Sequence, residues 1–255
     1  MIHPNVTHLY LYKPPNDYTL DIFKKDLLWA SKPEAFNDPF DCDLEASKGI
    51  AEADVLAAFR ATYGAKAKWP ADIVKYHDKI FDQHGKFVPA ERQRIDDEIK
   101  AFIQENRDSG VVCLAEANDI ILMWAHYAAS HTGICIEFER TPKSALGDAE
   151  LCEPVKYDSK YPVIDLGKML LHRDGQTQNL MMRYKADCWA YEKEWRIIAD
   201  KGNINCSLPG KITKVILGIS IKPEFLAKVK DLCDKKGIPL AQAKKGSMEF
   251  KIEVP

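Results

Sequence analysis

The residues best suited to carry chemistry are two carboxylates and a guanidinium, Glu192, Glu194 and Arg196. In a β-strand, alternate positions share a face, so a strand here would place all three side chains in one row. Adjacent carboxylates raise the pKa of one acid and a nearby arginine lowers it, so the row could fix a chosen protonation state. The alternative is a surface ladder of Glu–Arg pairs, which contributes little to stability.

A second group contains Trp124, His126, Tyr127 and His131, on a helix predicted over residues 119–130. Tyr127 and His131 would share a helix face, whereas His126 and His131 would not, which disfavours a metal site between the two histidines. Trp124 and Tyr127 could form a stacking wall for a nicotinamide or adenine ring, with a histidine, His126 foremost, as acid or hydrogen-bond donor. The alternative is an amphipathic core helix with buried aromatic rings.

A third group, rich in turn formers, surrounds Pro39. One interpretation is a ligand-gating loop in which Asn37 and Asp38 make polar contacts, and the other is a loop that only caps its neighbours. Metal binding by the aspartates of this loop has weak support, because it lacks the glycine and terminal glutamate of a calcium loop. We therefore expect no metal.

The elements that position these groups alternate between helical and extended patterns. Strands are predicted at 8–13, 27–31, 111–115, 133–139, 154–157, 195–198, 214–218 and 248–254, and helices at 17–26, 119–130 and 223–235, with a helix-rich stretch at about 163–191. Residues 52–107 have helical periodicity and are predicted to form a helical insert. The expected fold is a single α+β domain over 1–255 with a mixed, mostly antiparallel sheet.

Composition excludes several classes of protein. The 255 residues carry a formal net charge of -2, which gives no strong nucleic-acid footprint. Seven cysteines without a C-x-x-C pair indicate reduced thiols, and no leader or long apolar run is present, so we expect a cytoplasmic protein that does not enter membranes. Phosphate-loop, Rossmann, zinc-protease and α/β-hydrolase motifs are missing from the sequence.

Four blocks resemble one bacterial family, the domain of unknown function numbered 2971. They are LYKP near the start, FNDPFDC at 36–42, MWAHYAASHTGICIEF at 123–138 and WAYEKEWRII at 189–198. The resemblance spans nearly the whole chain, but the family implies no settled activity. One departure is Cys113-Leu114-Ala115, where relatives commonly read Cys-Phe-Ser.

The E-x-E spacing of Glu192 and Glu194 is similar to the signature of ADP-ribosyltransferases, which implies NAD as co-substrate. By this resemblance Glu194 binds the nicotinamide-ribose hydroxyl and stabilises an oxocarbenium-like transition state, while Glu192 orients the acceptor. The fold also implies cofactor contacts from the first two strands, here at Tyr10, Lys13 and Ser31. The further expected cofactor contacts are Asn37, Asp38, Trp124, Tyr127 and Arg196. The acceptor would be a protein or nucleic acid, as in a toxin or an anti-phage effector.

Two alternatives remain open from the sequence. One is a nuclease or other hydrolase that uses His126 or His131 with Glu137 and the two glutamates, with or without a divalent metal. The other is a non-catalytic module whose polar cleft binds a nucleotide or peptide.

Overall fold

The computed structural model describes residues 3–42, 51–162 and 181–255. In its first half, the elements are β1 (His8–Lys13), α1 (Asp17–Lys25), β2 (Leu27–Ala30), η1 (Pro33–Ala35), α2 (Glu52–Tyr63), η2 (Lys66–Lys68), α3 (Ala71–Ile80), α4 (Pro89–Asp108), β3 (Gly110–Ala115) and α5 (Ile121–His126). In its second half, they are β4 (Ile134–Glu139), η3 (Ala145–Gly147), β5 (Cys152–Pro154), β6 (Lys156–Asp158), β7 (Tyr184–Ala186), η4 (Asp187–Glu192), β8 (Glu194–Ala199), β9 (Ile204–Ser207), β10 (Ile212–Leu217), α8 (Pro223–Lys236), β11 (Leu240–Gln242), β12 (Lys244–Lys245) and β13 (Ile252–Glu253).

Seven strands form the main sheet in the order β11-β10-β4-β1-β3-β8-β5. Within this sheet, the pairing of β10 with β11 is parallel and the other five pairings are antiparallel. The smaller pairs are β2 with β9, β6 with β7 and β12 with β13. The structure therefore confirms the α+β class with a mixed, mostly antiparallel sheet.

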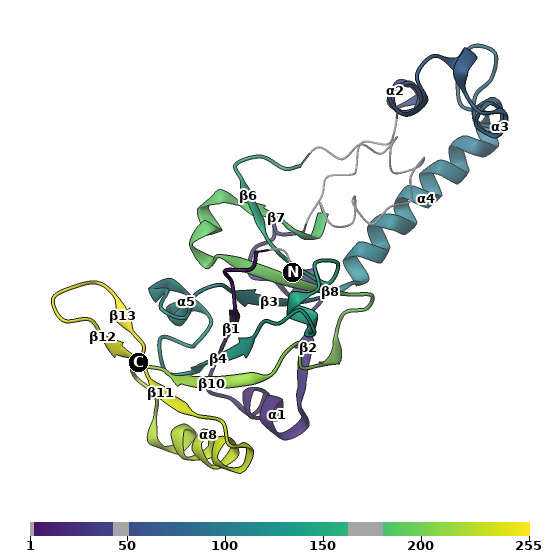
Figure 1. Cartoon of the computed structure of the whole chain (residues 1–255). Helices are drawn as coiled ribbons and strands as arrows, with labels where there is room; N and C mark the ends of the chain where they lie inside the picture. Colours follow the sequence, from purple (N-terminus) through teal and green to yellow (C-terminus); the bar gives the residue numbers. More distant parts are fainter. Residues whose placement is uncertain (1–2, 43–50, 163–180) are drawn as a thin grey trace.

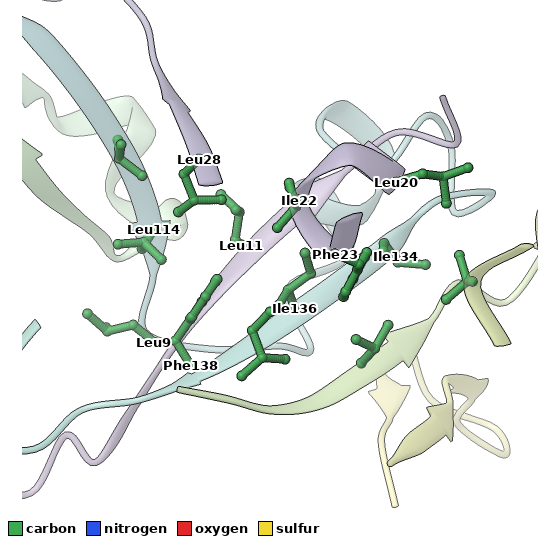
Figure 2. Packing of buried hydrophobic residues seen from close by; sticks show 14 of the residues in the cluster. Leu9, Leu11, Leu20, Ile22, Phe23, Leu28, Leu114, Ile134, Ile136 and Phe138 are labelled. Atoms are coloured by element: carbon green, nitrogen blue, oxygen red, sulfur yellow. The ribbon is translucent and has the colours of Figure 1, made fainter. Parts of the chain in front are cut away.

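The two faces of this sheet bury different residues because side chains alternate along each strand. Leu9 and Leu11 of β1 point to a core that α1 and α8 cover with residues such as Phe23 and Val229. Figure 2 shows how closely the apolar side chains of β1, β4 and α1 pack in this core. Tyr12, on the other face, packs with α5 and the β12–β13 hairpin.

Residues 52–108, which we call the helical arm, form α2, α3 and α4 and extend from the sheet (Figure 1). The arm buries its own apolar cluster, in which Phe59 packs with Phe81 and Ile95, separate from the core under the sheet. Lys32 of the main body pairs with Asp108 at the base of α4, with 2.6 Å between Nζ and Oδ1.

Four predicted elements differ from the structure. The strand predicted over 154–157 is divided between β5 and β6, which lie in different sheets. The helix predicted over 119–130 is confined to α5 and ends at His126, because Ala129, Ser130 and His131 all have positive φ angles. The strand predicted over 248–254 is reduced to β13. The helix-rich stretch predicted at 163–191 lies outside the described residues up to 180, and after residue 183 it contains β7 and the short helix η4.

Candidate functional site

A cavity of about 490 Å³ opens beside β1 and β3, within the size range of small-molecule sites in proteins. The register explains the opening: β1 pairs with β3 only at Tyr10 and Ala115, although both strands continue past that point. Residues 11–13 and 111–114 therefore line the cavity instead of pairing with each other. The loop after β2, helix α5 and the segment from β7 to β8 supply the other walls.

Glu194 and Arg196 reach the cavity side of the sheet from the start of β8. Trp195, between them, points to the opposite face and is buried in the main core. Arg196 holds Glu194 through two hydrogen bonds, from Nε to Oε1 at 2.7 Å and from Nη2 to Oε2 at 3.0 Å. Both side chains are buried, so this pair is not the exposed ladder that was the alternative.

Glu192 lies close to Glu194, but it belongs to a different element from the one predicted. It ends η4 instead of lying in the strand, and Lys193 then turns the chain through a left-handed conformation with φ of 45°. The prediction of three side chains in one strand row was wrong for Glu192. Its carboxylate still meets the cluster because it accepts hydrogen bonds from Tyr127 at 2.7 Å and from Lys185 at 2.5 Å.

Lys185 of β7 is the central cation of this cluster, which we call the charge cluster and define as Asp41, Lys185, Glu192, Glu194 and Arg196. Its Nζ lies 2.5 Å from Glu192 Oε2, 3.0 Å from Glu194 Oε2 and 3.4 Å from Asp41 Oδ2. Arg196 Nη2 also contacts Asp41 Oδ2, at 2.6 Å. With three carboxylates and two cations charged, the cluster carries one net negative charge.

The electrostatics of the cluster keep Glu194 ionised. Burial alone would raise the pKa of Glu194, but the charges of Arg196 and Lys185 outweigh it and hold the pKa at about 2. Burial would lower the pKa of Lys185, yet the surrounding carboxylates raise it above its ordinary value. At neutral pH both groups are therefore charged.

Eight of the residues predicted from sequence line this cavity. They are Tyr10, Lys13, Ser31, Asn37, His126, Tyr127, Glu192 and Glu194. Each of the three residue groups described from the sequence therefore contributes side chains to the same cavity. His126 is exposed, whereas Tyr127 is half-buried and bonded to Glu192.

Three predicted contacts lie elsewhere. Trp124 is fully buried, and its Nε1 donates to the Asn118 carbonyl, so it is a core residue and not a wall of the cavity. Asp38 is buried and caps its own loop by accepting from the Phe40 amide. Arg196 lies beneath the cavity, where it holds Glu194 and Asp41.

Tyr10 and Lys13 differ in how they are held. Burial, together with a hydrogen bond to Glu137, raises the pKa of Tyr10 to about 12, so its phenol stays protonated. Burial lowers the pKa of Lys13 below its ordinary value. Among the described residues, no hydrogen-bond or ion-pair partner is recorded for the Lys13 ammonium group.

Lys185 and Asp41 belong to the site but were not among the site residues predicted from the sequence. Lys185 fell in the stretch predicted to be rich in helix, where nothing distinguished it from other lysines. Asp41 was considered only for metal binding. The signal that could have found them is charge balance, because buried glutamates require cations nearby.

His131 and Glu137 do not line the cavity. The positive φ of His131 places its ring against Trp124, with ring centroids 6.3 Å apart, so it shares no helix face with Tyr127. Glu137 accepts a hydrogen bond from Thr213 at 2.8 Å. Of the residues considered for a hydrolase, His126, Glu192 and Glu194 line the cavity, whereas His131 and Glu137 do not.

The described residues contain neither a metal-binding group nor a helix that could span a membrane. Within them, no set of three or more His, Cys, Asp or Glu side chains is placed to hold a metal ion. Across the same ranges, no helix combines the length and apolar character needed to cross a membrane.

The fold and the cavity define an α+β protein with a polar, small-molecule-sized site opened beside a diverging strand pair. Residues 123–197 match a family model described as "Protein of unknown function (DUF2971)". This match confirms the resemblance to that family, which the sequence blocks at 123–138 and 189–198 had indicated. No curated protein and no solved structure gives a match.

Proposed function

We propose that the cavity binds NAD and that the protein transfers ADP-ribose from NAD to a macromolecular acceptor. One observation carries the proposal: Tyr10 of β1, Ser31 after β2 and the two glutamates around Lys193 line a single cavity. These are the positions that the resemblance to ADP-ribosyltransferases had implied. An acceptor on a macromolecule would suit a toxin or an anti-phage effector.

The net negative charge of the charge cluster supports this reaction. In the transfer, the bond between the nicotinamide nitrogen and ribose C1′ breaks, and nicotinamide leaves as a neutral molecule. The ribose then carries oxocarbenium-like positive charge until the acceptor forms a bond to C1′ and loses its proton. A fixed, ionised Glu194 stabilises that positive charge in a site partly shielded from water.

The hydrogen bonds of the two glutamates divide their roles in our proposal. The oxygens of Glu194 already accept from Arg196 twice and from Lys185 once, and its pKa also reflects a bond to Cys113. The oxygens of Glu192 accept only from Tyr127 and Lys185 among the described residues. Because a carboxylate offers about four acceptor sites, Glu192 has room for a ribose hydroxyl and Glu194 does not. Our proposal therefore differs from the role that the resemblance implied: Glu192 binds the ribose hydroxyl, and Glu194 acts chiefly through its charge.

His126 is the candidate to take the proton from the acceptor. It is exposed and lines the cavity, so it can reach a group that approaches from solvent. A histidine is suited to this step because an imidazole nitrogen can accept a proton and release it again.

The proposal is tested by incubating the protein with NAD labelled in the nicotinamide ring and measuring nicotinamide release. Wild-type protein should release nicotinamide, and Glu194→Gln and Glu192→Gln should each reduce the rate at least about a hundredfold, in the range of lost electrostatic stabilisation. Glu249→Gln, on the exposed hairpin segment far along the chain, serves as the matched control. Equal rates in all four proteins, or no release by wild type with any acceptor supplied, would reject the proposal.

The same measurement with a chelator added distinguishes our proposal from the hydrolase alternative. Release that is unchanged by a chelator agrees with our proposal, which uses no metal. Activity that requires a divalent metal and is indifferent to NAD would instead support hydrolysis.

A further inference from the structure

A second cavity, of about 610 Å³, lies next to the first and has no role in the proposal above. The two cavities share Lys13 and Trp29 in their walls. The second is formed by α1, the end of β1, the edge of β2 and Asn205 of β9. A molecule bound there would therefore lie directly beside the contents of the first cavity.

Two aromatic rings in this second cavity are exposed to solvent. The exposed fraction of Tyr18, on α1, is 85%, and that of Trp29, on β2, is 50%. Trp29 faces away from the core because Leu28 and Ala30, on either side of it, point inward. Neither ring stacks on another aromatic ring of the described chain, so both keep a face free for a planar ligand.

The polar groups around these rings are of the kinds that form hydrogen bonds with the edges of nucleic-acid bases. Asn205 brings a side-chain amide, and Asp21 brings a carboxylate. The amide oxygen of Asn16 caps α1 by accepting from Thr19, which leaves the amide nitrogen of Asn16 for a ligand. Amides pair with adenine edges, and carboxylates accept hydrogen bonds from exocyclic amino groups such as that of cytosine.

The charges fit a ligand with a phosphate. Lys25 is already paired with Asp21, at 2.7 Å between Nζ and Oδ2. Lys13 lines both cavities, and no side-chain partner of its amino group lies among the described residues, so this group can meet an anion between them. Burial lowers the pKa of Lys13, and a bound anion would offset that effect. Stacking rings flanked by a cation are the combination used to bind single strands without strong sequence preference.

We propose that the second cavity binds a base of a single-stranded nucleic acid, stacked against Trp29 and Tyr18, as the acceptor that the first cavity modifies. The role as acceptor rests on the proposed function, whereas the binding itself does not. The overall charge of -2 is compatible with this, because one or two bases are held by stacking and not by a long basic surface.

The experiment is fluorescence anisotropy of short labelled DNA and RNA strands of one mixed sequence, in the absence of NAD. We expect saturable binding of a single strand and weaker binding of the matching duplex, whose bases are already stacked. Trp29→Ala and Tyr18→Ala should each weaken binding about fivefold to a hundredfold, the range for loss of a base–aromatic stack. Phe250→Ala removes a fully exposed ring elsewhere and should leave binding unchanged.

Both aromatic variants should fold normally, since their rings are exposed, and thermal unfolding checks this. The inference is overturned if neither single strand binds, if an unstructured peptide binds and the strands do not, or if all three variants bind alike. Strand binding without nicotinamide release would reject the proposed function but not this site. Nicotinamide release without strand binding would reject this site alone.

Discussion

At the scale of single residues, the account depends on Lys185, which contacts three carboxylates in a buried setting. Its position explains how Glu192 and Glu194 can both be buried and ionisable, a situation that is strongly unfavourable without a cation. Arg196 alone could not serve, because it is recorded with Glu194 and Asp41 but not with Glu192.

Removing the positive charge of Lys185 should strongly destabilise the folded protein. Lys185→Met leaves the carboxylates with one cation, and we expect a loss of about 3–5 kcal/mol in the free energy of unfolding, measured by urea denaturation. Lys185→Met combined with Glu192→Gln removes one charge of each sign and should recover part of that loss. If Lys185→Met alone were as stable as wild type, Lys185 would not be the cation that stabilises the charge cluster.

The lowered pKa of Glu194 predicts a pH dependence of stability. Since the pKa falls from 4.5 to about 2 on folding, its contribution is present above the unfolded value and is lost as pH decreases through the folded one. The contribution is roughly 3 kcal/mol by the usual conversion. Wild-type protein should therefore lose more stability between about pH 5 and pH 2 than Glu194→Gln, as measured by urea denaturation at each pH. Parallel curves for the two proteins would contradict the assignment.

At the scale of elements, the cavity exists because β1 and β3 pair at one position and then stop pairing. The end of β1 stays paired with β4, where Lys13 lies opposite Ile134, and it closely contacts Gly133 just before that strand. A Cβ added at Gly133 would lie 2.0 Å from the Lys13 carbonyl oxygen, so only glycine fits there without movement of the strand.

Gly133→Ala should therefore disturb both stability and the site. A matched variant is Gly147→Ala, whose added Cβ would lie 1.9 Å from the Thr141 carbonyl oxygen, away from the cavity lining. Both should lower the melting temperature, but only Gly133→Ala should also weaken NAD binding when measured by calorimetry on the folded protein. Equal NAD affinity in the two variants would show that the end of β1 does not shape the site.

The sequence predicted these elements unevenly, for physical reasons. Strand β1 was predicted with its observed bounds, because alternating aromatic and aliphatic residues end at two prolines. Helix α5 was predicted too long. Ala129, Ser130 and His131 have positive φ angles, which glycine usually adopts, but none of the three is a glycine, so the sequence carries no local signal for the end of the helix. The helix-rich stretch predicted at about 163–191 includes most of η4 but also contains strand β7. The tertiary contact of Glu192 with Lys185 has no local sequence signal.

At the scale of the whole molecule, the helical arm and the sheet have separate apolar cores. We predict that they lose structure separately, because cooperative units usually follow such clusters. Phe59→Ala removes a fully buried ring of the arm and should cost about 3–5 kcal/mol within it. Hydrogen exchange should then speed up in α2–α4 and stay unchanged in β1 and β4. Faster exchange throughout would mean that arm and sheet unfold as one unit.

The convergence of the three residue groups was the part of the site that sequence could indicate, because each group carries side chains of unusual type and spacing. The charge balance and the shared wall of the two cavities required coordinates, since Asp41, Lys185 and Trp29 are unremarkable in sequence. The single-domain organisation and the use of NAD remain predictions.

The most direct test is a crystal structure of Glu194→Gln grown with NAD, a variant chosen to prevent turnover. The account predicts the dinucleotide in the cavity beside β1 and β3, with a hydroxyl of the nicotinamide ribose within hydrogen-bond distance of Glu192. NAD bound elsewhere, or an unoccupied cavity at a concentration that saturates binding in solution, would contradict it.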